Sequence, residues 1–495
     1  MVPSAIVSKE TTAFPHKYFQ GTALEPLYHS AATLSAPSPF IRSRPPSSFM
    51  KSFPLLPALC LFLIAAGARP ARADLKSWLD KPEPDYQWEL AETVHMPGCD
   101  IFRLKLVSQV WQGIQWNHDL VVFAPKDAAP TDQILLLNEG GGANPRGYPY
   151  GMLLAAKIKA PCAMLLGIPN QPLFDGKRED SLIAETFVKY LETGDESWPL
   201  LFPMVKSVIK SMDTLQAFSE KHLSKRLERF ILTGGSKRGW NTYLTAASDP
   251  RVSAIAPMVF DSLNMALQLP HQKEIYGGYS RMIDDYTSRS LVPMPDTPAA
   301  KKLWSWVDPW FYRQRLTMPK LILAGNNDPF WNTDALNLYW DGLPENKWIA
   351  YIPNAGHSLN EKSVKTGQSD RNRAIDNLCA FVRWQLTGTP VPTLTWRHDD
   401  AEDGQSRLTV TTSQTPKTAT LWTAKATARD FRESTWQPQT LEIPTDGKIT
   451  ALVPKPATGG QAFYIECGFP MEELTSHFCT QLRVVVPKAA SGSRK

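Results

Sequence analysis

Three side chains of this sequence have the types and the order that nucleophilic catalysis needs: Ser236, Asp328 and His357. A serine hydroxyl is a weak nucleophile until a histidine accepts its proton, and the histidine needs a carboxylate to hold its tautomer. A single histidine or aspartate after a strand is ordinarily a surface or turn residue. All three in the order serine, acid, histidine predict the catalytic triad of an α/β-hydrolase.

Each of the three residues directly follows a short apolar segment that predicts a β-strand. Because parallel strands place their carboxyl ends at one edge of a sheet, we expect the three side chains to converge there. The segments, in the order of the triad residues, are Phe230–Thr233, Leu321–Ala324 and Trp348–Ile352.

The turn around the serine, TGGSKRG, favours a strained strand-to-helix elbow. Gly234 and Gly239 flank Ser236 and would let the strand and the helix approach closely. The usual pattern G-x-S-x-G has its second small residue where this chain has Arg238, so a glycine-rich turn that merely contains a serine stays an alternative. A phosphate-binding loop is disfavoured, because the lysine follows the serine.

A second glycine-rich turn, NEGGGANP, follows the predicted strand Ile134–Asn138. Backbone N–H groups of such a turn stabilise the oxyanion in many hydrolases. We therefore expect Gly140 or Gly141 to act with the N–H of Lys237, although Glu139 stands where the related motif has histidine. The alternative is a flexible hairpin.

Strands alternating with helices predict a doubly wound, mostly parallel sheet of α/β-hydrolase type over residues 74–388. Asp261, at the end of the predicted strand Val252–Phe260, is the alternative acid. The aromatic segment Pro270–Pro319 predicts a helical insertion, either a lid over a cavity or the core of an inserted subdomain.

Beyond Pro390 and Pro392 the sequence becomes rich in threonine and in alternating apolar residues, without a long helical pattern. This predicts a smaller immunoglobulin-like β-sandwich over residues 389–495, with a short disordered tail. The alternative is a set of extra strands packed on the catalytic domain.

The N-terminal 73 residues predict no folded domain. Residues 1–49 are expected to be disordered or to precede the true start, Met50. Residues 50–73 combine a lysine, a short apolar run and the sequence Ala-Arg-Ala, which is typical of a signal peptide cleaved after Ala73. We expect a secreted or periplasmic protein without a stable membrane span; the alternative is an uncleaved anchor.

Charge and cysteine content indicate which partners, metals and disulfides to expect. The net charge of +5 comes from the first 73 residues, and the remainder has 46 residues of each sign, which does not favour nucleic acid. No spacing of His and Cys indicates a metal site, and no cofactor is expected. Five cysteines follow residue 73, of which Cys467 and Cys479 are the expected disulfide pair.

Long stretches of the chain resemble the PhoPQ-activated pathogenicity-related protein family over roughly Tyr86–Leu386. The stretches are TGGSKRGWNTYLTAASDPRVSAIAPMVFDSLNM, EDSLIAETFVKYLETGDESWPLLFPMVKSVIKSMD and LILAGNNDPFW. The resemblance implies an exported α/β-hydrolase-like protein that in some bacteria is linked to survival of cationic antimicrobial peptides. The spacing of Ser236 and Gly239, with the glycine three positions after the serine, is also similar to that in glucuronoyl esterases.

Two functions fit these observations. The first is a serine hydrolase that cleaves an ester or an amide, with a peptide as the favoured substrate and a carbohydrate ester as the next. The second is a catalytically silent protein of the same fold that binds a peptide or a cell-wall component.

Overall fold

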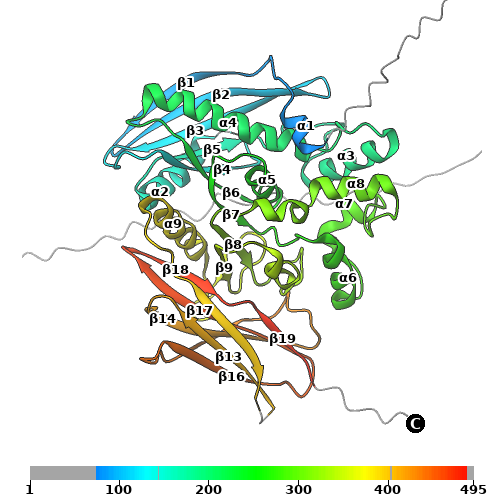
Figure 1. The fold of residues 1–495 in the computed structure, drawn as a ribbon, viewed down its shortest axis with the longest axis vertical. Coiled ribbons are helices and arrows are strands. Elements are labelled where there is room, and N and C mark those ends of the chain that lie inside the picture. Colours follow the sequence, from blue (N-terminus) through cyan, green and yellow to red (C-terminus); the bar gives the residue numbers. More distant parts are fainter. Residues whose placement is uncertain (1–73, 143, 402–403, 488–495) are drawn as a thin grey trace, which may run out of the picture. The chain divides into compact units, whose positions relative to one another are not determined.

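The computed structural model describes residues 74–142, 144–401 and 404–487 of the 495-residue chain. The expected signal peptide and the residues before it lie outside this part. A nine-stranded mixed sheet runs through the fold in the order β1-β2-β3-β5-β4-β6-β7-β8-β9 (Figure 1). Its strands are β1 Gln87–Met96, β2 Cys99–Trp111, β3 Ile114–Pro125, β4 Gln133–Asn138, β5 Cys162–Leu166, β6 Arg229–Gly235, β7 Val252–Met258, β8 Lys320–Gly325 and β9 Lys347–Ile352.

The pairings divide the sheet into two parts. Strands β1, β2, β3 and β5 pair antiparallel, whereas the run β5-β4-β6-β7-β8-β9 is parallel. All six residues of β4 and of β8 are buried, as expected for parallel strands covered on both faces. The antiparallel edge strand β1 was not predicted, because most of its side chains are exposed and its sequence lacks an apolar run.

Helices cover both faces of the sheet. Along β4 the side chains of Ile134 and Leu136 belong to one core, and those of Leu135 and Leu137 to the other. Helices α3, α4, α5 and α8 add apolar side chains to the first core, and α2 and α9 add theirs to the second. The helices are α1 Leu75–Leu79, α2 Tyr148–Ile158, α3 Glu179–Thr193, α4 Leu201–His222, α5 Lys237–Ala246, α6 Met265–Tyr276, α7 Asp284–Thr287, α8 Pro298–Val307 and α9 Asn372–Thr387.

The aromatic segment between β7 and β8 forms helices α6, α7 and α8 and several short turns. Two of its tryptophans are buried against α3: Trp304 contacts Phe187, and Trp306 contacts Tyr190 at a ring distance of 5.2 Å. This part of the insertion is therefore a packed subdomain core rather than a detached lid.

The C-terminal part forms two further sheets, β12-β13-β16 and β15-β14-β17-β18, with β19 paired to β17. The alternation of apolar residues expected beyond Pro392 is clearest in β13 and β16, where buried positions alternate with more exposed ones. Helix α9 packs against β18, and the ring of Trp348 in β9 lies 6.2 Å from that of Phe478. The strands are β12 Leu394–Asp400, β13 Gln405–Thr412, β14 Thr418–Ala426, β15 Gln437–Thr440, β16 Lys448–Pro454, β17 Gly460–Met471, β18 Leu474–Cys479 and β19 Arg483–Val485.

The expected disulfide between Cys467 and Cys479 is wrong. Cys467 pairs in register with Phe478, so Cys479 lies opposite Glu466 on the next position of the ladder. Neighbouring positions on a strand point to opposite faces, and the two thiols accordingly belong to different buried cores. All five cysteines of the described part are free and buried.

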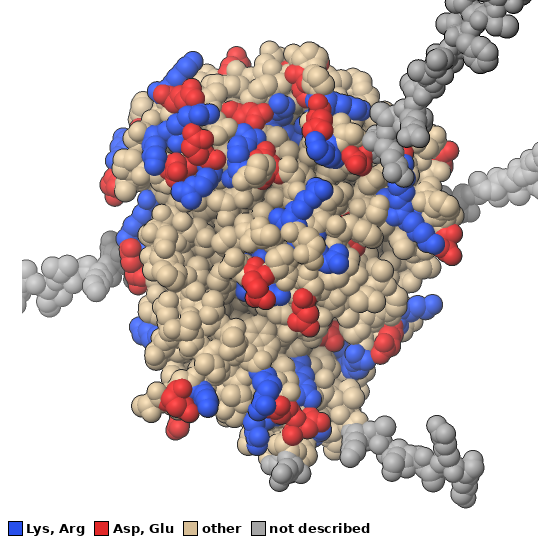
Figure 2. Space-filling view, viewed as in Figure 1, with Lys and Arg blue, Asp and Glu red and all other residues tan. Residues whose placement is uncertain are grey.

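On the face shown in Figure 2, acidic and basic side chains are interspersed, and no large area carries a single sign of charge. Among the helices of the described part, none is both long enough and apolar enough to cross a lipid bilayer.

Candidate active site

Ser236 lies at a sharp elbow between β6 and α5, with a backbone φ of 57° and ψ of −123°. A residue other than glycine seldom adopts this conformation, and residues that do are concentrated at functional sites. The elbow is possible because a Cβ on Gly239 would lie 2.9 Å from the carbonyl oxygen of Met258, closer than packing allows. Gly234 is equally constrained by Asn138 and Arg238.

Asp328 and His357 are brought together by the neighbouring parallel strands β8 and β9. The Nδ1 atom of His357 lies 2.7 Å from Oδ2 of Asp328. The other carboxylate oxygen accepts a hydrogen bond from the N–H of Phe330 at 2.9 Å, and the Phe330 ring packs 4.1 Å from the imidazole. The carboxylate of Asp328 and the imidazole of His357 are thus both held in place.

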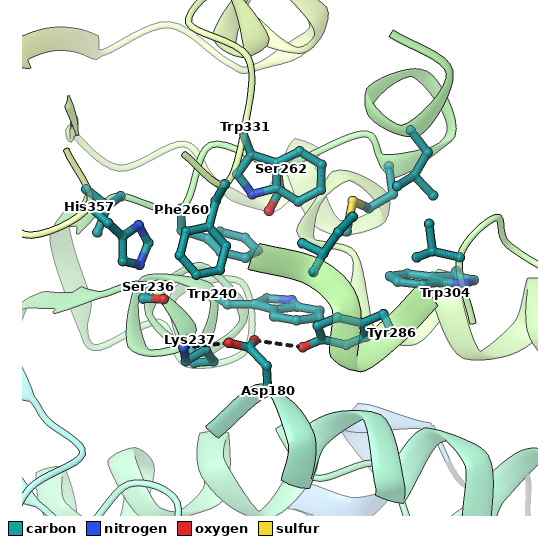
Figure 3. Close-up of a pocket in the computed structure, with 16 residues that line it drawn as sticks. Asp180, Ser236, Lys237, Trp240, Phe260, Ser262, Tyr286, Trp304, Trp331 and His357 are labelled. Atoms are coloured by element: carbon teal, nitrogen blue, oxygen red, sulfur yellow. Dashed lines mark hydrogen bonds and ion pairs between the residues drawn. The ribbon is translucent and has the colours of Figure 1, made fainter. Parts of the chain in front are cut away.

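Ser236 and His357 line the same cavity, and Figure 3 shows them at the same end of it. The Nε2 atom of His357 is buried and has no hydrogen-bond partner among the described residues, so no bond to Ser236 is formed in this structure. Bonds between a nucleophile and its base are often long before substrate binds.

Asp261, the alternative acid, is hydrogen-bonded to a different partner in this structure. Its carboxylate accepts a hydrogen bond from the hydroxyl of Tyr339, whereas the imidazole of His357 is bonded to Asp328. Burial raises the pKa of Asp261 to about 7, against the hydrogen bond from Tyr339, which lowers it.

Replacing Asp261 by asparagine is expected to flatten the pH dependence of stability. Between its ordinary pKa of 3.8 and about 7, the folded protein holds a proton that the unfolded chain has lost. Wild-type stability is therefore highest below this window and falls as the pH rises through it. Urea unfolding across this window measures the effect; an equally steep fall in Asp261→Asn would contradict it.

The expected oxyanion donors lie in two different environments. Lys237 is the first residue of α5 and lines the cavity, so its N–H is at a helix N-terminus beside Ser236. Gly140 and Gly141 follow β4; a Cβ on Gly140 would overlap the guanidinium of Arg238, and the carbonyl of Gly141 accepts from the N–H of Gly167 at 2.7 Å. Neither glycine lines the cavity, and their role stays a prediction.

A charged network beneath the elbow was not predicted. The guanidinium of Arg238 is buried and makes two hydrogen bonds to Glu179, of 2.6 and 2.7 Å, and a third to the carbonyl of Ile168. Burial alone would raise the pKa of Glu179, but the pairing with Arg238 outweighs burial and holds the pKa at about 2. Arg238 therefore has a structural partner, which explains why a large residue stands where the common motif has a small one.

A second pair at the N-terminus of α3 lies in the cavity wall. The ammonium of Lys237 is 2.8 Å from Asp180, whose other oxygen accepts from the hydroxyl of Tyr286 at 3.0 Å (Figure 3). The adjacent acids in the sequence EDSL and the adjacent bases in SKRG were the available signal for both pairs.

Apart from Ser262, the remainder of the cavity wall is apolar, and half of its apolar residues are aromatic. The cavity has a volume of only about 40 Å³. The cavity is therefore a narrow slot. Its apolar lining residues are Trp240, Val259, Phe260, Met265, Leu269, Ile283, Val292, Trp304, Phe330 and Trp331.

Within the described residues, no group of three or more His, Cys, Asp or Glu side chains is arranged to hold a metal ion. The chemistry that the site can supply with its own residues is that of a serine, an imidazole and a carboxylate.

The sheet order, with a serine at a positive φ after β6 and an acid–histidine pair after β8 and β9, defines an α/β-hydrolase fold. The chain belongs to the family of PhoPQ-activated pathogenicity-related proteins, whose sequence profile matches residues 75–432. This confirms the resemblance found in the sequence.

Autocrine proliferation repressor protein A of Dictyostelium discoideum is 30% identical over 479 residues, which cover 88% of this chain and 95% of that protein. Two solved structures are more distant. Acetyl xylan esterase 1 from Thermoanaerobacterium sp. is 15% identical with a TM-score of 0.41, covering 57% of this chain and 86% of its own. Glucuronoyl esterase from Solibacter usitatus is 12% identical with a TM-score of 0.36, covering 56% and 83%. Likeness of this size carries no argument about substrate.

Proposed function

We propose that the chain is a serine hydrolase that cleaves an ester or amide bond through an acyl-enzyme on Ser236. One observation carries the proposal: a serine in a strained elbow shares a cavity with a histidine whose far ring nitrogen is hydrogen-bonded to a carboxylate. The backbone conformation of Ser236 costs on the order of 1–3 kcal/mol, and strain of this kind is concentrated at functional sites.

In the proposed reaction, Oγ of Ser236 attacks the substrate carbonyl carbon while Nε2 of His357 accepts the hydroxyl proton. The tetrahedral intermediate collapses, the bond to the leaving group breaks, and Nε2 returns the proton to the leaving oxygen or nitrogen. Water then attacks the acyl-enzyme by the same route. Asp328 holds the Nδ1–H and stabilises the imidazolium, and the N–H groups of Lys237 and of Gly140 or Gly141 are the proposed oxyanion donors.

A pre-steady-state experiment with p-nitrophenyl acetate tests this proposal. The proposed acyl-enzyme predicts a burst of nitrophenol equal to the enzyme concentration whenever deacylation is slower than acylation. Hydroxylamine, which intercepts acyl-enzymes, should form the hydroxamate faster with wild type than with Ser236→Ala, whose rate should equal that of hydroxylamine acting on the ester alone. A burst in Ser236→Ala as large as that of wild type would refute the assignment.

Peptides remain our first proposed substrates, with esters of cell-wall or plant polymers second. The slot favours an uncharged apolar group on the acyl side of the scissile bond, because Asp180 and Lys237 neutralise each other. It gives no support to recognition of a cationic side chain inside the cavity, so a link to cationic antimicrobial peptides would need contacts elsewhere.

The dependence of kcat/KM on the acyl chain length of p-nitrophenyl esters is expected to show whether the slot binds the acyl group. Each added methylene should raise kcat/KM by roughly three- to fourfold, corresponding to about 0.8 kcal/mol of apolar burial. The rise should end where the chain meets Trp304, which lies at the end of the slot away from Ser236 (Figure 3). In Trp304→Leu the optimum should move to longer chains.

The matched control is Trp306→Leu. Trp306 is a neighbouring tryptophan of α8 that packs against Tyr190 and Phe202 and does not line the slot. An identical length optimum in wild type and both variants would show that the slot does not receive the acyl group.

The second candidate is a catalytically silent binding protein, and it is favoured by the absent hydrogen bond between His357 and Ser236 in the described part of the chain. The two candidates differ in the burst experiment. Export is a separate proposal, checked by sequencing the mature N-terminus, which should begin at Asp74.

A further inference from the structure

The two loops that carry the catalytic acid and base are held by one segment of the C-terminal part, Arg429–Trp436, which connects β14 to β15. The side-chain amide of Asn327, the residue before Asp328, points into a ring of carbonyl groups of this segment. Its Nδ2 atom lies 3.1 Å from the oxygen of Phe431, 3.0 Å from that of Arg432 and 2.7 Å from that of Ser434.

The loop that carries His357 is held by the same segment. Asn354 donates from Nδ2 to the carbonyl oxygen of Trp436 at 3.0 Å and accepts from the N–H of Trp436 at 2.8 Å. This reciprocal pair fixes both the position and the orientation of a backbone that has a φ of 54° at Asn354.

The two catalytic loops also contact each other. The N–H of Asn327 donates to the carbonyl of Ala355 at 2.9 Å. A Cβ on Gly325 would lie 2.5 Å from the carbonyl oxygens of Ala355 and Gly356, so only glycine permits this approach. A displacement of either loop is therefore transmitted to the other.

The segment is itself anchored in the core. Phe431 and Trp436 are fully buried, and the ring of Trp436 packs 5.5 Å from that of Tyr464 in β17. On the other side, the guanidinium of Arg432 lies 3.8 Å from the ring centre of Tyr276 in α6. The segment thus contacts the C-terminal sheets, the insertion between β7 and β8, and the loops that follow β8 and β9.

We propose that Arg429–Trp436 is a clamp that positions Asp328 against His357, with Asn327 and Asn354 as positioning residues. The inference rests on the proposed hydrolase function and extends it, because it makes the C-terminal part a component of the active site. A misplacement of about 1 Å in a catalytic group can lower the rate about 10²-fold.

The test compares Asn327→Ala with Asn337→Ala. Asn337 makes the same kind of link, donating to the carbonyl of Leu482 at 2.8 Å and accepting from Gln481 at 3.1 Å, but no catalytic residue is on its segment. The readouts are the rate of labelling by a fluorophosphonate, kcat and KM for p-nitrophenyl acetate, and the thermal midpoint of unfolding.

We expect Asn327→Ala to lower the labelling rate and kcat about 10- to 100-fold with KM within about threefold, and Asn337→Ala to leave both rates within about threefold. Asn354→Ala is the second variant if Asn327→Ala does not fold, and it should behave alike. Equal rates in wild type and the clamp variants, or equal losses in Asn337→Ala, would overturn the clamp. Failure of wild type itself to be labelled would instead refute the proposed function.

Discussion

Replacing Ser236 by alanine is expected to lower kcat for any substrate of this protein by a factor on the order of 10⁶. Without the hydroxyl no acyl-enzyme can form, and only substrate binding and oxyanion stabilisation remain to accelerate attack by water. The measurement is steady-state hydrolysis of p-nitrophenyl acetate by purified wild type and variant, with thermal unfolding recorded on the same samples.

The matched control is Ser248→Ala. Ser248 follows α5, and its hydroxyl donates to the carbonyl of Leu244 at 2.7 Å rather than facing the cavity. Turnover in this variant should stay within about threefold of wild type. A loss below tenfold in Ser236→Ala, with both variants folded, would remove Ser236 from the reaction.

Replacing Arg238 by methionine is expected to lower the free energy of unfolding strongly. Removing one partner of a buried ion pair costs about 3–5 kcal/mol, because the other charge is left desolvated. The Glu179 side chain is 38% exposed, so water screens it and we expect about 2–3 kcal/mol instead. Urea unfolding of wild type and Arg238→Met measures the difference.

A double-mutant cycle with Glu179→Gln separates the ion pair from the loss of packing. The double variant should be more stable than the sum of the single losses predicts, because no unpaired charge remains. Additive losses, or an Arg238→Met variant within about 0.5 kcal/mol of wild type, would show that the pair does not support the elbow.

The places of the three proposed triad residues in the fold could be predicted because the rule behind them is local. Ser236, Asp328 and His357 each come within a few residues of the end of an apolar strand, which is visible in the sequence, and parallel strands end at one edge. In the structure His357 is hydrogen-bonded to Asp328, and Asp261 accepts from Tyr339 instead; the role of Asp328 as the catalytic acid stays a prediction.

Contacts between distant segments could not be predicted in this way. The bond between Asn327 and Ser434 joins residues 107 positions apart, and nothing in either local sequence indicates the partner. Arg238 looked like a defect in the elbow motif because Glu179, its partner, lies 59 positions earlier.

Two further features of the structure differ from what local sequence patterns indicate. Closeness in the sequence suggested a bond between Cys467 and Cys479, but strand register puts their side chains on opposite faces. The strand β1 could not be predicted because it lies at an edge of the sheet with most of its side chains exposed, so its sequence has no apolar run.

Peptide mapping by mass spectrometry after reaction with a fluorophosphonate tests the catalytic assignment most directly. One covalent adduct per chain is expected, located on Ser236, with a labelling rate that falls sharply in His357→Ala. A folded wild-type protein that gains no adduct, or gains it on another residue, would contradict the assignment.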